Sequence, residues 1–167
     1  VDVLHVFAEG AATMRVRLVS MFPIVAARGP ELTRAETVTI LNDLCLLAPG
    51  ALVGPGLRWE DAGAGSARVH FSLGPNTASA LLSFNDADEL IDFESDDRLM
   101  ASPDGKQFTR RRWSTPVSSY QSLAGRRVMR HGEGRWHLEG DAAFAYIELD
   151  LLDLEIDAPD AGQDPPR

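Results

Sequence analysis

One acidic residue stands where a β-strand would point its side chain toward an apolar face. In the segment 89–99, residues two apart share a face, and Asp97 shares its face with Ile91 and Phe93. Burying a carboxylate is costly unless it is paired. We therefore expect Asp97 either to cap a turn or pair with an arginine, or to act on a ligand by acid–base chemistry. The side chains that could assist such chemistry are Asp43, Arg98 and Ser114.

Two potential nucleophiles have simpler structural explanations. Ser114 lies in the sequence Trp-Ser-Thr-Pro, which is typical of a strand end because proline interrupts the hydrogen-bond ladder. It lacks the glycine-flanked turn of hydrolases and would need a base within reach. Cys45 falls on the apolar side of a predicted helix, where a free cysteine packs as a small hydrophobe, and Asp43 falls on the polar side. We expect structural roles for all three, with Asp43 and Ser114 kept as acid–base candidates.

Four polar residues alternate along one strand near the C-terminus: His131, Glu133, Arg135 and His137. Two ligands at this spacing could approach one metal ion. Trp136, however, belongs to the opposite face, and a large aromatic side chain usually marks the buried side. We therefore expect the polar row to face solvent, and we predict neither a metal nor a cofactor.

Four aromatic residues could either fill the core or line a ligand cavity: Trp59, Trp113, Trp136 and Tyr146. The faces of aromatic rings suit apolar ligands as well as they suit core packing. The sequence leaves both roles open, and these four residues are our candidates for ligand binding.

The surrounding sequence predicts one amphipathic helix among many strands. Apolar residues recur at helical spacing from Val38 to Ala48. Thr33 and Glu36 match a capping box at the start of the helix, and Pro49 ends it. The segments that alternate between apolar and polar residues, or are apolar throughout, predict strands at 1–8, 12–22, 57–60, 66–73, 77–84, 89–99, 108–113, 126–138 and 143–156.

The order of these segments indicates the fold class. Short turns between successive strands favour antiparallel pairing. The first strand, VDVLHVFA, is strongly apolar, which is typical of burial on both faces. We predict a mainly β (α+β) fold, in which a curved antiparallel sheet or half-barrel meander packs around one helix.

The composition is that of a soluble, acidic protein of one domain. The chain has 167 residues, of which 44% are hydrophobic, and a formal net charge of −9. We expect a single β-rich domain over 1–157 and a flexible tail over 158–167. The charge disfavours nucleic acid and anionic membranes as partners, since the only dense basic run is 110–112. One cysteine excludes an intrachain disulfide, and with no signal peptide or membrane span visible, the cytoplasm is the default location.

Three short motifs are the most distinctive parts of the chain: NDLCLLAP at 42–49, SDDR at 95–98 and WSTP at 113–116. With these motifs, the sequence resembles an uncharacterised family of bacterial proteins that is catalogued as a domain of unknown function. The resemblance spans nearly all of 1–157 and implies no activity. It implies that further sequence precedes the position of Val1 in relatives, so we expect this chain to lack upstream strands.

Three functional hypotheses follow. The first is a non-enzymatic domain that binds an apolar or lipid-like small molecule in the concave face of the curved sheet. The second is a hydrolase or isomerase that uses the Asp97 carboxylate for acid–base chemistry. The third is a structural or interaction domain of a longer protein, which could self-associate through the exposed edge of its first strand.

Overall fold

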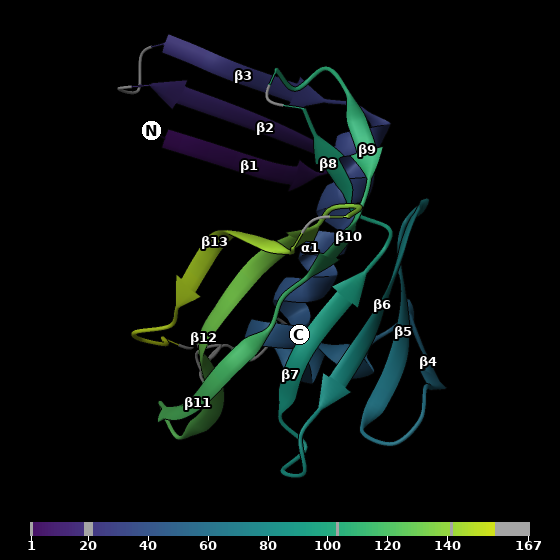
Figure 1. Cartoon of the computed structure of the whole chain (residues 1–167), viewed down its shortest axis with the longest axis vertical. Helices are drawn as coiled ribbons and strands as arrows, with labels where there is room; N and C mark the ends of the chain where they lie inside the picture. The colour runs from purple at the N-terminus through teal and green to yellow at the C-terminus, as the bar shows by residue number, and fades with distance from the viewer. Residues whose placement is uncertain (1, 19–21, 103, 141, 156–167) are drawn as a thin grey trace, which may run out of the picture.

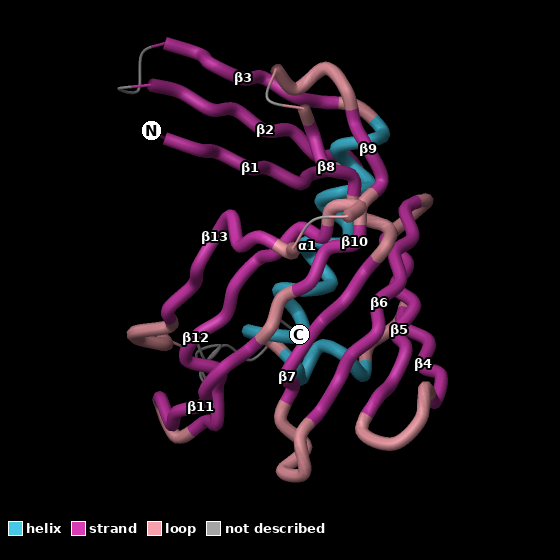
Figure 2. The backbone as a smooth tube through the Cα atoms, viewed as in Figure 1, coloured by secondary structure: helices cyan, strands magenta, loops and turns pink. Residues whose placement is uncertain are grey.

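The computed structural model describes residues 2–18, 22–102, 104–140 and 142–155. Within these residues the chain forms one long helix and antiparallel sheets that are not closed into a barrel (Figures 1 and 2). The predicted mainly β fold with a curved sheet and one helix is therefore confirmed. The expected tail, 158–167, lies outside the described residues.

The largest sheet has eight strands. They are β4 (Leu57–Asp61), β5 (Ser66–Leu73), β6 (Asn76–Phe84), β7 (Leu90–Ser95), β10 (Arg112–Ser114), β11 (Val117–Leu123), β12 (Arg126–His137) and β13 (Phe144–Asp150). Their order is β11-β12-β10-β7-β6-β5-β4, and β13 pairs with β12 beside this path. Two strands thus flank the C-terminal half of β12, with β10 on one side and β13 on the other.

Two smaller sheets complete the fold. One has the order β1-β2-β3 and is built from β1 (Asp2–Ala8), β2 (Ala11–Leu18) and β3 (Phe22–Arg28). The other is a pair of short strands, β8 (Leu99–Ala101) and β9 (Phe108–Arg110). Figure 1 shows both at one end of the molecule, at the top of the view, with the large sheet below them.

The helix α1 (Pro30–Leu47) connects the small sheet to the large one, and a 3-10 turn, η1 (Pro49–Val53), follows it. The predicted capping box is wrong, because the helix begins one turn earlier, with Gly29 as N-cap and proline in its first turn. The Thr33 hydroxyl donates to the Gly29 carbonyl oxygen at 2.9 Å and accepts from the backbone N–H of Ala12 at 3.1 Å. This threonine therefore ties the helix to β2.

Two hydrophobic clusters of unequal size hold the elements together. The larger lies between α1 and the large sheet and contains Val38, Leu41, Cys45, Val69, Leu82, Phe93 and Met129, among others. Among the side chains whose burial the structure describes, the smaller has Ala12 and Leu32 as its buried members, with Phe7, Met14 and Phe108 packed against them. It joins the small sheet, the start of α1 and β9.

The single cysteine is buried in the larger cluster. Cys45 is unpaired and 7% exposed, and burial raises the pKa of its thiol to about 12. A thiol of this kind is inert as a nucleophile. The structure thus agrees with the structural role expected for Cys45.

The prediction that the first strand is buried on both faces is wrong. β1 is an edge strand, and its residues Leu4 and Val6 are 56% and 43% exposed. β2 and β3 contact α1, whereas Val6 and Phe7 on β1 line a hollow of about 200 Å³ beside α1. An exposed apolar edge is what the self-association hypothesis requires, and that hypothesis stays a prediction.

Asp92 on β7 provides a test of the electrostatics of the large sheet. Burial, with a smaller contribution from Glu94, raises the pKa of Asp92 to about 6. The folded state disfavours the ionised carboxylate of Asp92. Its contribution to the free energy of unfolding is therefore fully present below about pH 4 and is lost as the pH rises through the folded pKa of about 6. We expect Asp92→Asn to raise the free energy of unfolding at pH 7 by roughly 1 kcal/mol, a value discounted for partial exposure.

Thermal melts of the wild type and of Asp92→Asn at pH 4 and pH 7 would check this expectation. The asparagine keeps an oxygen that can accept the 2.9 Å bond from the Phe93 N–H. Asp96→Asn serves as the control, since the Asp96 side chain is 70% exposed. An equal effect of Asp92→Asn at both pH values would contradict the assignment.

Candidate ligand-binding site

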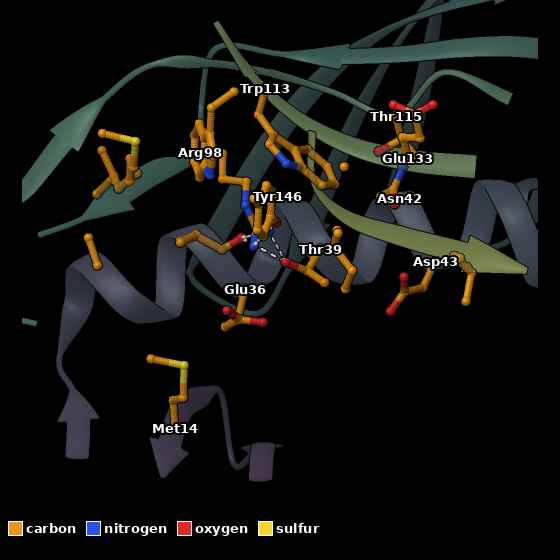
Figure 3. A pocket seen from close by; sticks show the side chains of 18 of the residues that line it. Met14, Glu36, Thr39, Asn42, Asp43, Arg98, Trp113, Thr115, Glu133 and Tyr146 are labelled. Carbon is orange, nitrogen blue, oxygen red and sulfur yellow. Dashed lines mark hydrogen bonds between the residues drawn. The ribbon is translucent and has the colours of Figure 1, made fainter. Parts of the chain in front are cut away.

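A cleft of about 450 Å³ runs along α1 between the large sheet and the β8–β9 pair. Figure 3 shows the side chains that line it, with α1 below and strands of the large sheet above. The volume lies within the range of small-molecule sites in proteins. Apolar residues make most of the wall, including Leu32, Leu46, Met100, Phe108, Trp136, Tyr146, Ile147 and Leu149.

The inward face of β12 carries two glycines. Gly132 and Gly134 are both buried and both line the cleft. A Cβ atom at Gly134 would lie 2.5 Å from Cγ2 of Ile147, so the Ile147 side chain would have to shift. A Cβ atom at Gly132 would meet only ordinary contacts, the nearest at 3.6 Å from the Pro116 carbonyl oxygen. Gly134 therefore makes room for the Ile147 side chain, whereas Gly132 can accept a small side chain.

Aromatic rings form one end of the cleft. Trp113 and Trp136 face each other across the β10–β12 pair, and the Trp136 ring stacks on Tyr146 with centroids 5.9 Å apart. The structure thus brings three of the four aromatic candidates to one cleft. The fourth, Trp59, is 41% exposed and lines a separate hollow of about 320 Å³ near the C-terminal end of α1.

The guanidinium group of Arg98 lies among these rings. Its Cζ is 4.4 Å from the ring centroid of Trp113 and 5.7 Å from that of Trp136. Arg98 donates to the carbonyl oxygen of Ala35 at 3.3 Å, to the Thr39 hydroxyl, and at 3.5 Å to the Tyr146 hydroxyl. Among the described residues, no carboxylate comes within ion-pair distance of it.

Polar atoms without hydrogen-bond partners gather around the same cleft. Within the described part of the chain, the buried atoms Asn42 Nδ2, Arg98 Nε, Trp113 Nε1 and Thr115 Oγ1 have no partner, and all four residues line the cleft. Asn42 and Trp113 are each 4% exposed, and Thr115 is 6% exposed. Such groups are rare in folded proteins, because each costs roughly 1–3 kcal/mol when it is left unsatisfied.

Sequence reasoning missed Asn42 and Thr115. A signal for Asn42 was present, since it lies four residues after Val38 and so shares the buried face of the helix. The sequence gives only a weak signal for Thr115, which lies two residues after Trp113 at a predicted strand end. A threonine in such a place most simply forms hydrogen bonds to nearby backbone groups.

Two acidic residues also line the cleft, on another side of the helix. Figure 3 shows Glu36 and Asp43 on the side of α1 turned toward Met14, away from Asn42 and Thr115. Burial raises the pKa of Asp43, while Arg98 opposes this rise and Glu36 adds to it. Asp43 and Arg98 are the two members of the acid–base set that line the cleft.

Asp97 is held in a network of its own, outside the residues that line the cleft. Its Oδ2 accepts from the backbone N–H and the hydroxyl of Ser79, at 2.9 and 2.8 Å. Its Oδ1 accepts from Arg34 at 2.8 Å and Arg110 at 3.2 Å. Burial alone would raise the pKa of Asp97, but the hydrogen bonds from Ser79 and Arg34 outweigh it and hold the pKa below its usual value. This is the arginine pairing that the sequence offered as the structural alternative.

The position of Asp97 also departs from the predicted alternation. The segment 89–99 is not one strand, because β7 ends at Ser95 and β8 starts at Leu99. Asp97 lies in the link between them, where alternation no longer decides which way a side chain points. Ile91, expected on the inner face, is 41% exposed.

Ser114 has a base within reach but little access. Its hydroxyl oxygen lies 2.8 Å from Nε2 of His137, and the residue is 2% exposed. Ser114 points to the other face of β10 from its neighbours Trp113 and Thr115, and it does not line the cleft. The four acid–base candidates therefore do not converge on one cleft.

The polar row on β12 is occupied by ion pairs. His131 Nδ1 lies 2.8 Å from Oδ1 of Asp150, and Arg135 donates to Glu133 at 2.8 Å. Among the residues that the structure describes, no group of three or more histidine, cysteine or acidic side chains could hold a metal ion. In the same part of the chain, no helix has both the length and the apolar content needed to cross a membrane.

One protein family matches nearly the whole chain. A model of the family described as a family of unknown function (DUF6544) matches residues 1–149. The chain belongs to this family. Comparison with the curated proteins and with the solved structures gave no match.

Membership of DUF6544 confirms the resemblance to a family of unknown function. The matched residues include the small sheet, α1, the large sheet as far as β12 and most of β13. They also include every residue that lines the cleft, from Met14 to Leu149. The cleft is thus a feature of the DUF6544 part of the chain.

Proposed function

We propose that this protein binds an apolar or lipid-like small molecule in the cleft beside α1. The observation that carries the proposal is a hollow of about 450 Å³ whose wall is mainly aliphatic and aromatic and whose floor contains two glycines. Small-molecule sites in proteins combine this size with this kind of wall and a few polar groups. The concave face of the sheet, next to the helix, is the place that the sequence analysis favoured.

The rim of the cleft supports an apolar ligand. Tyr146, Ile147 and Leu149 on β13 line the cleft, and they are 46%, 54% and 41% exposed. Clustered exposed apolar residues are typical of interaction sites. A hydrocarbon chain lying against them would be favoured by roughly 25 cal/mol for each Å² of apolar surface removed from water.

The acid–base alternative has less support from the geometry. The Asp97 carboxylate is fully occupied by Ser79, Arg34 and Arg110, and its lowered pKa makes it a weak base. Ser114 is closed off from the cleft. The apolar-ligand proposal needs neither group.

Native mass spectrometry of freshly purified protein tests the proposal. We expect a reproducible mass above that of the chain, which is lost on denaturation and is recovered in an organic extract. Protein stripped of this ligand should bind the neutral apolar fluorophore N-phenyl-1-naphthylamine, with quenching or energy transfer from Trp113 and Trp136. A clean chain mass together with no uptake of the fluorophore would refute the proposal.

A further inference from the structure

We propose that the polar end of the bound molecule is an anion with several acceptor oxygens, a carboxylate or a phosphate, received by Arg98, Asn42 and Thr115. The inference rests on the proposed function and narrows its ligand to an anionic amphiphile. It follows from what the cleft leaves unsatisfied rather than from its apolar wall.

The unpartnered atoms are almost all donors. Asn42 Nδ2, Arg98 Nε and Trp113 Nε1 can only donate, and the Thr115 hydroxyl can do so. Asn42, Trp113 and Thr115 are more than nine-tenths buried. Burying several donors near one cavity with no acceptor is unfavourable, so the complementary group is rich in acceptor oxygens.

Arg98 adds a positive charge to the lining of the same cleft. Its guanidinium is held over Trp113 and fixed to α1 through Ala35 and Thr39, and it has no ion pair among the described residues. A planar guanidinium that is fixed and partly desolvated is the preferred partner of carboxylates and phosphates. Among the described residues that line the cleft, Arg98 is the one lysine or arginine, so no other cationic side chain there competes with it for an anion.

The acidic side chains of the cleft offer the rival reading. Glu36 and Asp43 could favour a cationic group, and Glu133 also lines the cleft. Glu133 is paired with Arg135 at 2.8 Å, and Glu36 and Asp43 lie on the side of α1 away from Asn42 and Thr115 (Figure 3). Asn42 and Thr115 thus lie away from Glu36 and Asp43, and Arg98, which binds Thr39 and lowers the pKa of Asp43, lies between the two groups. The apolar residues Trp136, Ile147 and Leu149 line the same cleft.

Four ligands with twelve carbon atoms each distinguish an anionic from a neutral or cationic polar end. Dodecanoate, dodecyl phosphate, dodecanol and dodecylamine are titrated into stripped full-length protein below their micelle concentrations, with binding followed by calorimetry. We expect at least one of the two anions to bind about 10-fold or more tightly than dodecanol, and dodecylamine to bind no better than dodecanol. Which anion binds better distinguishes a carboxylate from a phosphate ligand.

Variants locate the effect. We expect Arg98→Met to abolish the preference for the anion while dodecanol affinity changes less than about 3-fold. Arg112→Met is the matched control, because Arg112 is an exposed arginine outside the cleft with only distant contacts to Glu94 and Asp96, at 3.9 and 4.0 Å. If Arg98→Met does not fold, Thr115→Val, which keeps the shape and removes the hydroxyl, should weaken the anion several-fold and leave dodecanol unchanged.

The outcomes separate the two proposals. Equal binding of dodecanoate, dodecyl phosphate and dodecanol, or tighter binding of dodecylamine, would overturn the anion inference and leave the apolar cleft standing. Failure of all four to bind would count against both. A preference for the anion that survives in Arg98→Met and in Thr115→Val would overturn the assignment of these residues.

Discussion

Replacing Asp97 with alanine should lower the free energy of unfolding by about 3 kcal/mol. The carboxylate satisfies a backbone N–H and a hydroxyl of Ser79 on β6, and it also binds Arg34 on α1 and Arg110 on β9. Its removal leaves a partly buried N–H without a partner, which costs roughly 1–3 kcal/mol. The two arginines are 48% and 61% exposed, so their ion pairs add at most about 1 kcal/mol each.

Urea denaturation at pH 7 would measure this loss as a lower midpoint with an unchanged slope. Asp96→Ala is the matched control, as the neighbouring carboxylate is 70% exposed and its nearest cation contact is 4.0 Å. Because the folded state depresses the pKa of Asp97, its contribution is present above about pH 4 and is lost as the pH falls through the folded value. A loss below about 1 kcal/mol at pH 7 would show that Asp97 does not clamp these elements together.

Replacing Gly132 with leucine should abolish most ligand binding with little change in stability. The position is buried on the cleft floor, its φ lies outside the left-handed region, and a Cβ atom there has ordinary contacts to Pro116, Thr115 and Met129 at 3.6–4.0 Å. The rest of the leucine side chain would extend into the hollow. We expect affinity for N-phenyl-1-naphthylamine to fall about 10-fold or more, while the free energy of unfolding changes by less than roughly 1.5 kcal/mol.

Gly132→Ala is the control, because a single methyl group fits without filling the cleft, and it should bind within about 3-fold of the wild type. Gly134 is unsuitable for this purpose, since a Cβ atom there would clash with the side chain of Ile147, which itself lines the cleft. Unchanged binding in a well-folded Gly132→Leu would place the ligand elsewhere, for example in the hollow beside Trp59.

Local patterns explain why the fold class could be predicted. The helix shows apolar residues at helical spacing, and the meander strands β5 and β6 alternate in and out with short turns between them. The boundaries were harder. β11 lies outside the predicted strands because its residues are mostly polar. β3 was also not predicted, since no strong turn signal marks its start after the predicted strand 12–22.

The candidate site could be predicted only in part, for a physical reason. Aromatic residues can be named as candidates from their type alone, so Trp113, Trp136 and Tyr146 were among the residues predicted to bind a ligand. Asn42, Thr115 and the two glycines of β12 gain their role only when α1 lies across the sheet, which is a long-range arrangement that no local pattern encodes. The sequence pointed to Asp97 as a carboxylate that needs partners, but those partners lie 13 to 63 residues away in the chain.

The position of the cleft beside both hydrophobic clusters has a consequence for how an occupant would affect stability. The cleft touches both, through Met14, Leu32 and Phe108 on one side and Trp113 and Trp136 on the other. A molecule bound in the cleft would therefore contact both packing regions at once. Because a ligand that binds only the folded state stabilises that state, an occupied cleft should stabilise both regions together.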